Sequence, residues 1–160
     1  MGEMSEFNLK VRLFLKAYRW RRIDPVPWTP LKKPLSQCKL ALISSAGFVL
    51  RDQVVFDEKK IGGDPTFREI PSDMEVTDLI DTHRSESFDH TGMVRDPNVA
   101  FPLDRMRDLA ESGRIGSVNK RHLSFMGSIT ATGRFVKQTV PEAAGWLKAD
   151  GVDVALLVPV

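Results

Sequence analysis

Apolar and polar positions alternate in short segments along the chain, and this pattern predicts an α/β domain. The run 39–45 is mostly apolar and ends in small residues, which is typical of a buried parallel strand. Weaker runs predict an edge strand at 67–71 and a short strand at 78–82, and a further strand is expected within 115–125. Because helical segments separate these runs, we expect an open, mainly parallel sheet of the doubly wound type with flanking helices.

Two helices of the domain are predicted from apolar spacing. The first ends at Gly113, and its apolar face consists of Leu103, Met106, Leu109 and Ala110. The second covers most of 130–150 and restarts at Pro141, because proline suits the first turn of a helix.

The last predicted strand, 152–160, is a nearly continuous run of apolar residues. Such strands are buried on both faces of a parallel sheet, and functional groups follow their carboxyl ends. A covering helix should come next, so we expect an α/β domain whose C-terminal part is missing. The alternative is an edge strand that terminates the domain. In either case an unpaired apolar strand favours association through its edge, so a homo-oligomer is one expected form.

The N-terminal segment 1–24 predicts a basic amphipathic helix, set apart from the α/β domain at 25–160. Apolar residues recur at three- and four-residue steps from Ser5 to about Trp20, and basic residues fill the other faces. Prolines in 24–34 predict an extended connection. The helix either binds a membrane surface or a partner, or packs on its own domain with its arginines in water.

Composition narrows the class of protein. The 160 residues carry a net charge of only +2, so we expect no nucleic-acid partner. No apolar run approaches the roughly 20 residues of a membrane span, and no secretory signal is visible. The single cysteine, Cys38, excludes an intramolecular disulfide and a cysteine-only zinc site, and it suits a reducing compartment. We therefore expect a cytoplasmic protein.

A polar loop at 83–92 holds residues with chemical potential. His83, Asp89 and His90 are of the type that binds zinc or iron, but their spacing matches no standard motif, so we predict no metal. The loop either hydrogen-bonds its own backbone or forms a substrate or partner surface. There is no G-x-S-x-G elbow or glycine-rich phosphate loop, and Cys38 lacks a neighbouring histidine. No complete catalytic site can be assembled from these residues.

Several segments occur in a characteristic order: Ser87-Phe-Asp-His-Thr-Gly92 with Asp96-Pro-Asn98, Phe101-Pro-Leu-Asp-Arg-Met-Arg-Asp-Leu109 with Ile115-Gly-Ser117, Ser124-Phe-Met-Gly127, and Ala149-Asp-Gly-Val-Asp-Val-Ala-Leu-Leu-Val-Pro-Val160. With the first strand and the Gly63-Asp-Pro-Thr-Phe-Arg68 turn, they resemble the short members of the selenoprotein B family of glycine, sarcosine, betaine and D-proline reductases. The resemblance covers roughly residues 25–160.

In many of these relatives the Val-Pro-Val strand is followed by a selenocysteine or cysteine, and by a second cysteine two residues later. The resemblance therefore implies a redox-active residue immediately after Val160 and no catalytic residue within this chain. Because UGA encodes selenocysteine, we expect that the sequence was ended at such a codon and that the 160-residue form is inactive. A helix dipole would stabilise the selenolate or thiolate, and the second thiol would resolve the oxidised intermediate.

The activity that the resemblance implies is that of an oxidoreductase. Thiols reduce a small-molecule substrate, with cleavage of a C–N bond in an amino-acid-like molecule, and the dithiol becomes a disulfide. The implied partners are a subunit that carries a pyruvoyl group and a thioredoxin-like electron donor. Two alternatives stay open: a non-catalytic binding or assembly module that docks through the basic helix and the final strand, and a metal-dependent hydrolase built on the 83–92 loop.

The resemblance also carries over a set of substrate-binding or loop-shaping candidates: His83, Asp89, Thr91, Asn98, Arg105, Ser124, Met126 and Gly127. Arg105 either clamps a carboxylate or lies on a helix surface. Asp89 is interpreted as a loop-capping side chain rather than a proton carrier. Ser87 stands where the family usually has an asparagine.

Overall fold

The computed structural model describes residues 5, 7–18, 22–85 and 90–160. The chain divides into two compact units, Met1–Pro30 and Leu31–Val160.

The first unit contains helix α1 (Leu9–Ala17). The side chain of Asn8 caps it by accepting a hydrogen bond from the Val11 N–H at 3.0 Å. No residue of α1 is buried, and Leu9 and Phe14 are more than half exposed. The helix predicted from Ser5 is therefore present but shorter, because the backbone is already extended at Tyr18. Trp20 lies outside the described residues.

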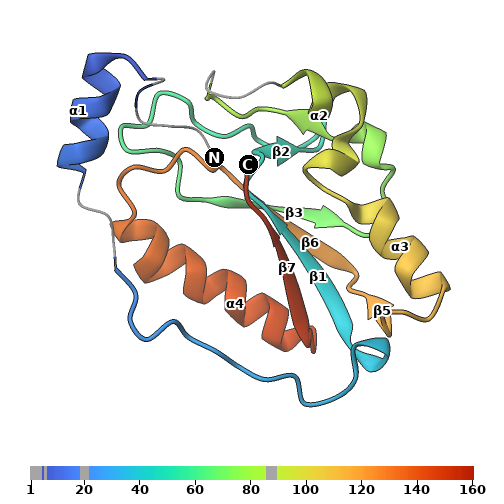
Figure 1. Cartoon of the computed structure of the whole chain (residues 1–160). Coiled ribbons are helices and arrows are strands. Elements are labelled where there is room, and N and C mark those ends of the chain that lie inside the picture. The colour runs from blue at the N-terminus through green and yellow to red at the C-terminus, as the bar shows by residue number, and fades with distance from the viewer. Residues whose placement is uncertain (1–4, 6, 19–21, 86–89) are drawn as a thin grey trace. The chain divides into compact units, whose positions relative to one another are not determined.

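The second unit is built on a curled, mainly parallel sheet with β1 (Lys39–Ser44) at its centre (Figure 1). On one side of β1 lie β5 (Ser117–Val118) and β6 (Arg121–Phe125), and on the other lies β7 (Val154–Val158). All three pair with β1 in parallel. The predicted edge strand, β3 (Phe67–Pro71), pairs antiparallel with β6. The α/β fold with a mainly parallel sheet, as expected from the sequence, is confirmed.

The strand predicted within 115–125 is divided into β5 and β6. The division occurs where the side chain of His122 enters the ladder, because its Nδ1 accepts the Leu42 N–H at 3.0 Å. The N–H of Asn119 donates to the Leu40 carbonyl at 2.8 Å just before this point. A side chain therefore replaces a backbone partner, and the backbone polar groups of β1 stay satisfied.

A small antiparallel ribbon lies outside the main sheet. It pairs β2 (Phe48–Val49) with β4 (Ile80–Asp81), the second of which lies within the strand predicted at 78–82. Two short 3₁₀ turns, η2 (Leu35–Gln37) and η3 (Val76–Asp78), precede β1 and β4.

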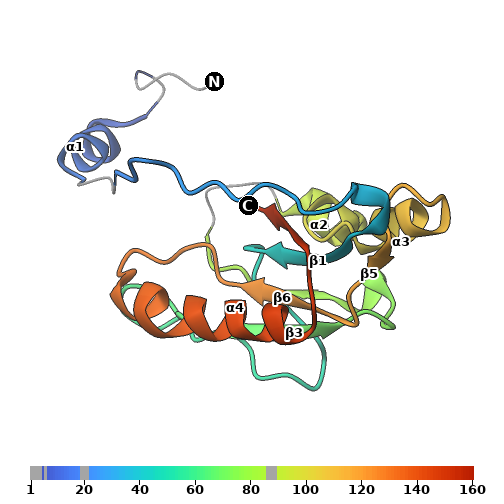
Figure 2. The same cartoon turned by 90° about the horizontal axis from the view of Figure 1, so that it is seen from below.

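Helices cover both faces of the sheet. Figure 2 shows α4 (Val140–Ala149) on one side and α2 (Thr91–Arg95) and α3 (Leu103–Glu111) on the other. A 3₁₀ turn, η4 (Pro97–Val99), joins α2 to α3, and a π-helical turn, η5 (Phe135–Thr139), leads into α4. The two helices that the apolar spacing predicts are thus present, and Gly113 follows the first in a left-handed conformation.

Each face of the sheet has its own apolar core. On the α3 face, residues of β1 pack with Phe101, Leu103 and Met106, all of which are essentially inaccessible to solvent. On the α4 face, Leu123 and Phe125 pack against Ala143 and Trp146. A fully buried side chain of this size contributes about 1.5–3 kcal/mol, so the two cores fix the sheet between the helices.

The strand β7 lies at the edge of the sheet. Within the described chain it pairs only with β1, and its residues 155–157 are exposed. Leu157 is 65% exposed and Leu156 is 41% exposed. An apolar strand with a free edge, as the sequence indicates, is therefore present in the fold.

Candidate functional site

Three parallel strands end side by side at one edge of the sheet. Ser45 follows β1, Gly127 follows β6 by two residues, and Val160 follows β7 by two residues. The N–H of Ser45 donates to the Val158 carbonyl at 3.1 Å, and the N–H of Val160 donates to the Ser45 hydroxyl at 2.8 Å. In open α/β sheets, ligands bind outside the carboxyl ends of the strands.

Gly127 brings these strand ends together with His83. A β-carbon on Gly127 would lie 2.9 Å from the Ser45 carbonyl oxygen and 3.1 Å from both the Val160 carbonyl oxygen and His83 Nε2. A side chain at this position would have to displace backbone or imidazole atoms, so close approach requires glycine here. We call Ser45, His83, Gly127 and Val160 the carboxyl edge.

His83 reaches the carboxyl edge from the end of β4. It is 9% exposed. Its backbone packs over Gly47, which has φ of +67°, and a β-carbon there would lie 3.2 Å from both N and Cα of His83. A left-handed glycine after β1 thus allows the His83 backbone to approach.

The loop that carries His83 is closed by its own side chains. Asp81 accepts the His83 N–H through Oδ1 at 2.9 Å, and its Oδ2 contacts His90 Nδ1. His90 Nε2 lies 2.8 Å from the Ser85 carbonyl oxygen, and the Ser85 N–H donates to His83 Nδ1 at 3.1 Å. The two imidazole rings lie 6.2 Å apart between their centroids.

These surroundings favour the neutral form of His83. Burial lowers the pKa of His83 below its ordinary value, and the nearby Asp81 carboxylate opposes that effect. Positive charge on His90 and Arg84 lowers the pKa further. The carboxyl edge therefore holds an imidazole that stays uncharged at neutral pH.

Arg84 ties the loop to two neighbouring segments. Its guanidinium donates to the Ser128 carbonyl at 2.9 Å, one residue beyond Gly127. It also donates to the carbonyls of Glu58 and Lys60 at 3.3 and 3.4 Å. One side chain thus links the loop after β4, the turn after β6 and the segment before β3.

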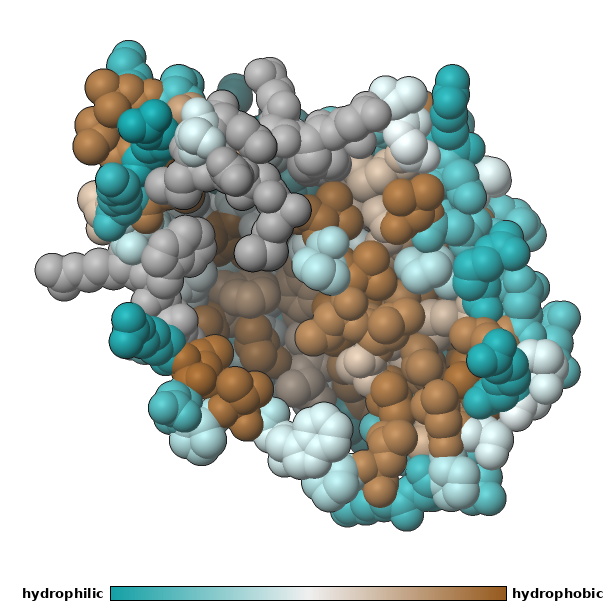
Figure 3. All heavy atoms as spheres, viewed as in Figure 1, coloured by the Kyte–Doolittle hydropathy of each residue, from teal (hydrophilic) through white to brown (hydrophobic). Residues whose placement is uncertain are grey.

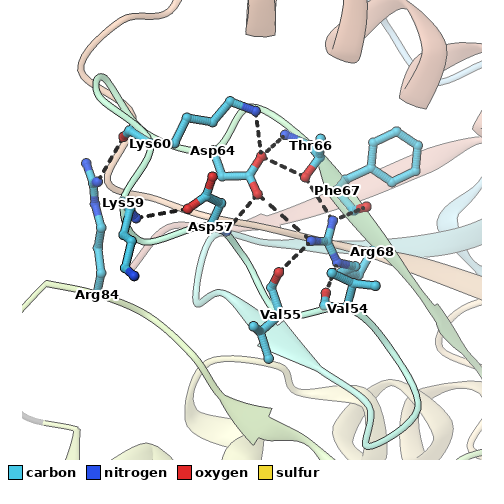
Figure 4. Close-up of polar contacts among 10 residues, drawn as sticks. All are labelled: Val54, Val55, Asp57, Lys59, Lys60, Asp64, Thr66, Phe67, Arg68 and Arg84. Carbon is cyan, nitrogen blue, oxygen red and sulfur yellow. Dashed lines mark hydrogen bonds and ion pairs between the residues drawn. The ribbon is translucent and has the colours of Figure 1, made fainter.

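The segment before β3 is held by a polar cluster around the Asp64 carboxylate (Figure 4). Asp64 accepts hydrogen bonds from the N–H groups of Asp57 and Thr66 and from the Thr66 hydroxyl at 2.8–3.1 Å. Arg68 Nη2 lies 3.9 Å from Asp64 Oδ2, and the Arg68 guanidinium also donates to three backbone carbonyls at 2.6–3.2 Å. Burial alone would raise the pKa of Asp64, but these hydrogen bonds and the charge of Lys60 lower it overall. The cluster is a support for the site and offers no reactive group.

An apolar groove adjoins the carboxyl edge on the α4 face. Its volume is about 410 Å³, and Ser45 and Pro159 belong to its lining. Apolar side chains from α4, β6 and β7 form the rest of it, including Phe125, Ala143 and Leu157. Figure 3 shows this hollow among apolar side chains.

The structure brings part of the candidate set together. His83 and Gly127 lie close together at the carboxyl edge, and the buried Met126 and Ser124 lie one and three residues before Gly127 in the chain. The hydroxyl of Ser124 has no hydrogen-bond partner among the residues described. Thr91 begins α2 and is exposed. Asp89 lies outside the described residues.

Two candidates have other roles in the fold. The side chain of Asn98 accepts the Asp104 N–H at 3.1 Å and donates to the Asp104 carboxylate at 2.8 Å, so it organises the first turn of α3. Arg105 lies on the surface of α3, where it pairs with Asp108 at 3.0 Å. Both side chains of that pair are more than 60% exposed. Of the two roles considered for Arg105, its position corresponds to that of a helix-surface residue.

His83 Nδ1 and both ring nitrogens of His90 face backbone or carboxylate partners. Those nitrogens would have to lose their partners before they could ligate a metal. No group of three or more histidine, cysteine, aspartate or glutamate side chains in the described part of the chain is arranged to hold a metal ion.

Sequence patterns alone did not single out Ser45, Asp81 or Arg84 as members of this site. A signal existed for Ser45, because small residues after a buried strand mark the carboxyl end of a sheet. Asp81 lies two residues before His83, and Arg84 lies one residue after it. The hydrogen-bond partners of these two side chains could not be predicted from sequence spacing.

Residues 4–159 match the model of one family, described as glycine/sarcosine/betaine reductase selenoprotein B. This chain belongs to that family. The resemblance drawn from the sequence motifs is thereby confirmed. The match begins at residue 4, so it includes α1, which lay outside the range 25–160 covered by the motifs.

Two curated relatives are similar to the chain. It is 37% identical over 136 residues to the D-proline reductase subunit gamma of Acetoanaerobium sticklandii, across 84% of this chain and 54% of that protein. It is 30% identical over 152 residues to the sarcosine reductase complex component B subunit beta of Peptoclostridium acidaminophilum, across 89% of this chain and 34% of that protein. The chain thus spans about half the length of the first relative and a third of the second. No solved structure matches it.

Among the helices of the described residues, none combines the length and the apolar character needed to cross a membrane.

Proposed function

We propose that this chain is part of a thiol-dependent reductase component that acts on a small amino-acid-like substrate at the carboxyl edge. The observation that carries the proposal is the convergence of Ser45, Gly127 and Val160 with the buried imidazole of His83. The names of the relatives support the substrate class, because one is a D-proline reductase subunit and the other a sarcosine reductase component.

The proposed redox-active residue is a selenocysteine or cysteine that follows Val160 in a longer form of the chain. Ser45 holds the N–H of Val160 at 2.8 Å, and Gly127 lies against the Val160 carbonyl. A residue joined to that carbonyl would therefore start at the carboxyl edge, beside Gly127. This placement is what the proposal requires of a catalytic thiolate or selenolate.

The proposed reaction is a two-electron reduction. The C–N bond of the substrate breaks, and the carbon and the nitrogen each gain a hydrogen. The selenolate or thiolate and a second cysteine together supply the two electrons and become a selenenyl sulfide or disulfide. A thioredoxin-like dithiol returns this pair to the reduced state and is itself oxidised.

The proposed partner is a subunit whose pyruvoyl carbonyl binds the amine of the substrate. Both curated relatives are named as subunits, which supports a multi-component assembly. We also place the protein in the cytoplasm, because free thiols need a reducing compartment.

The test starts from the gene, where an in-frame UGA or cysteine codon should follow the codon for Val160. The extended protein, with its partner subunit and dithiothreitol, should reduce D-proline, sarcosine or glycine. The matched control carries serine in place of the selenocysteine or cysteine and should be inactive. Equal activity of the 160-residue form, or a downstream sequence without either codon, would contradict the proposal.

A second candidate function is assembly without chemistry, and the exposed edge of β7 favours it. Leu157 is 65% exposed beside Leu156, and the outer edge of the strand can accept another strand. Sedimentation of the native chain and of L157K separates the two functions. If the chain is an assembly module, the L157K variant should sediment as a smaller species than the native chain. If the chain is part of a reductase, the extended form should turn over substrate.

A further inference from the structure

The positive charge of the chain is concentrated in its first unit. Residues 7–23 contain six basic residues and no acidic one, whereas Leu31–Val160 contain 17 basic and 18 acidic residues. Helix α1 holds three of the six, Lys10, Arg12 and Lys16, and contains no acidic residue that could form an ion pair within the helix. The segment therefore carries a local positive charge that a negatively charged surface would attract.

Helix α1 also exposes large apolar side chains. Leu9 and Leu13 lie about one helical turn apart and are 64% and 58% exposed, and Phe14 is 57% exposed. Lys10 and Lys16 lie on opposite sides of the two leucines, because they follow Leu9 and Leu13 by one and three residues, steps that turn in opposite directions around a helix. Lysines in such positions can keep their ammonium groups at a polar surface while the leucines enter an apolar phase.

The segment after α1 exposes apolar groups without forming a helix. Residues 22–30 have neither helical nor strand structure, and three prolines in this range favour an extended backbone. Within it Val26 is 77% exposed and Trp28 is 85% exposed. Tryptophan is enriched where water meets the apolar region of a membrane, because its ring is apolar and its N–H is polar.

We propose that residues 7–30, which we call the N-terminal arm, bind the surface of an anionic phospholipid membrane. Helix α1 lies in the plane of the membrane, with Leu9 and Leu13 at the boundary between head groups and acyl chains and the basic side chains at the phosphates. Trp28 adds a second contact at the same depth. A fluid bilayer accepts apolar side chains from a helix and from an extended segment alike, whereas a protein groove must match one shape.

This inference goes beyond the proposed function and does not depend on it. The cytoplasmic leaflet carries anionic lipids, so a surface of the required charge is available in the compartment that we propose for the protein. Each basic residue near such a surface strengthens binding about fivefold. Binding through the arm should therefore depend on both anionic lipid and low salt.

Flotation of the full chain with lipid vesicles tests the proposal without any enzymatic activity. The chain should float with vesicles of phosphatidylglycerol and phosphatidylcholine in equal amounts, and should stay behind with phosphatidylcholine alone. About 1 M salt should release it, because the Debye length is then only about 3 Å. No flotation with anionic vesicles, or equal flotation with both kinds, would overturn the proposal. So would a chain that ignores vesicles and instead binds its partner subunit through the arm.

Variants at exposed positions assign the binding to the arm. K16Q should weaken vesicle binding about fivefold, and K148Q, which removes the same charge from the exposed end of α4, should change it by less than about twofold. L13S should weaken binding several-fold, and the control is I61S, because Ile61 is fully exposed outside the arm. Equal effects of each variant and its control would show that the arm is not the membrane-binding surface.

Brominated lipid measures whether Trp28 enters the membrane, since bromine quenches tryptophan only at close range. The chain has three tryptophans, so W20F leaves Trp28 and Trp146, and W20F/W28F leaves Trp146 alone. Anionic vesicles with brominated acyl chains should quench W20F strongly and W20F/W28F little. Equal quenching of the two variants would contradict the position assigned to Trp28.

Discussion

The hydroxyl of Ser45 accepts a hydrogen bond of 2.8 Å from the backbone N–H of Val160, a residue 115 positions later in the chain. The bond lies just beyond Ser44 and Val158, the last paired residues of β1 and β7. It therefore fixes the direction in which the backbone leaves β7, and with it the position of any group joined to Val160.

Removing this hydroxyl should loosen the end of β7 without disturbing the core. We expect S45A to lower the free energy of unfolding by about 1 kcal/mol, the usual net contribution of one hydrogen bond. Amide exchange at Val160 should become faster, while S45T, which keeps the hydroxyl, should preserve the protection. Unchanged exchange in S45A would mean that the ladder alone holds Val160.

A β-carbon at Gly127 should disturb the carboxyl edge. In G127A the new methyl group would lie 2.9 Å from the Ser45 carbonyl oxygen and 3.1 Å from His83 Nε2, so one of them must move. We expect a loss of about 1–3 kcal/mol in chemical denaturation, together with a shifted His83 ring signal. The control is G145A in α4, where a β-carbon meets nothing within 4 Å and should stabilise the helix by up to about 1 kcal/mol.

The buried imidazole of His122 should make stability depend on pH. Burial lowers the pKa of His122 from 6.5 to about 4, with a further contribution from Arg107. The unfolded chain therefore binds the proton more readily, so stability is full above about pH 6.5 and falls as the pH drops toward 4. The loss from this residue reaches about 3 kcal/mol.

The variant H122N isolates that effect, because the asparagine oxygen can still accept the Leu42 N–H. In urea denaturation between pH 4 and 7, the free energy of unfolding of H122N should depend less steeply on pH than that of the wild type. Some dependence should persist, since the pKa of His83 is also lowered by burial. An identical pH dependence of the unfolding free energy in both proteins would show that His122 does not cause it.

The carboxylate of Asp150 joins the end of α4 to β6. It accepts two hydrogen bonds from Arg121 at 2.7 and 2.9 Å and one from Asn119 at 3.1 Å, and Arg121 also lies over the Trp146 ring at 4.6 Å. The Arg121 and Asn119 hydrogen bonds lower the pKa of Asp150 to about 2, so the pair persists to strongly acidic pH.

We expect D150N to cost about 2–4 kcal/mol, because it leaves the Arg121 charge without its carboxylate. The control is D108N, which breaks an exposed ion pair with Arg105 and should change stability by no more than about 0.5 kcal/mol. Thermal unfolding of both variants at one pH provides the comparison. Similar melting temperatures would contradict the role assigned to Asp150.

Strands with clear apolar periodicity were predictable from the sequence. The strand 39–45 and the edge strand 67–71 were placed almost to the residue, because their burial depends mainly on their own side chains. The split of 115–125 was not predictable, since it depends on His122 reaching Leu42 on another strand. The helix α2 was missed because five residues give too little periodicity to separate a turn of helix from a polar loop.

The site was predictable only in part. His83 and Gly127 entered through the family resemblance, and the structure places them close together. Ser45 and Asp81 act through partners set by strand pairing and loop geometry, which a linear pattern does not contain. Asn98 shapes α3 instead, because its side chain finds Asp104 only six residues away.

The central position of β1 has a consequence for how the chain is made. The N–H of Leu42 donates to His122, which is synthesised 80 residues later, and the N–H of Lys39 donates to Asp153, which is synthesised 114 residues later. At a synthesis rate of about 5–20 residues per second, the apolar β1 spends roughly 4–16 seconds outside the ribosome before its first neighbour exists. During that interval the backbone groups of β1 have no strand to pair with, and its apolar side chains are exposed. A chaperone that shields short apolar segments should therefore increase the fraction of newly synthesised protein that reaches the native state.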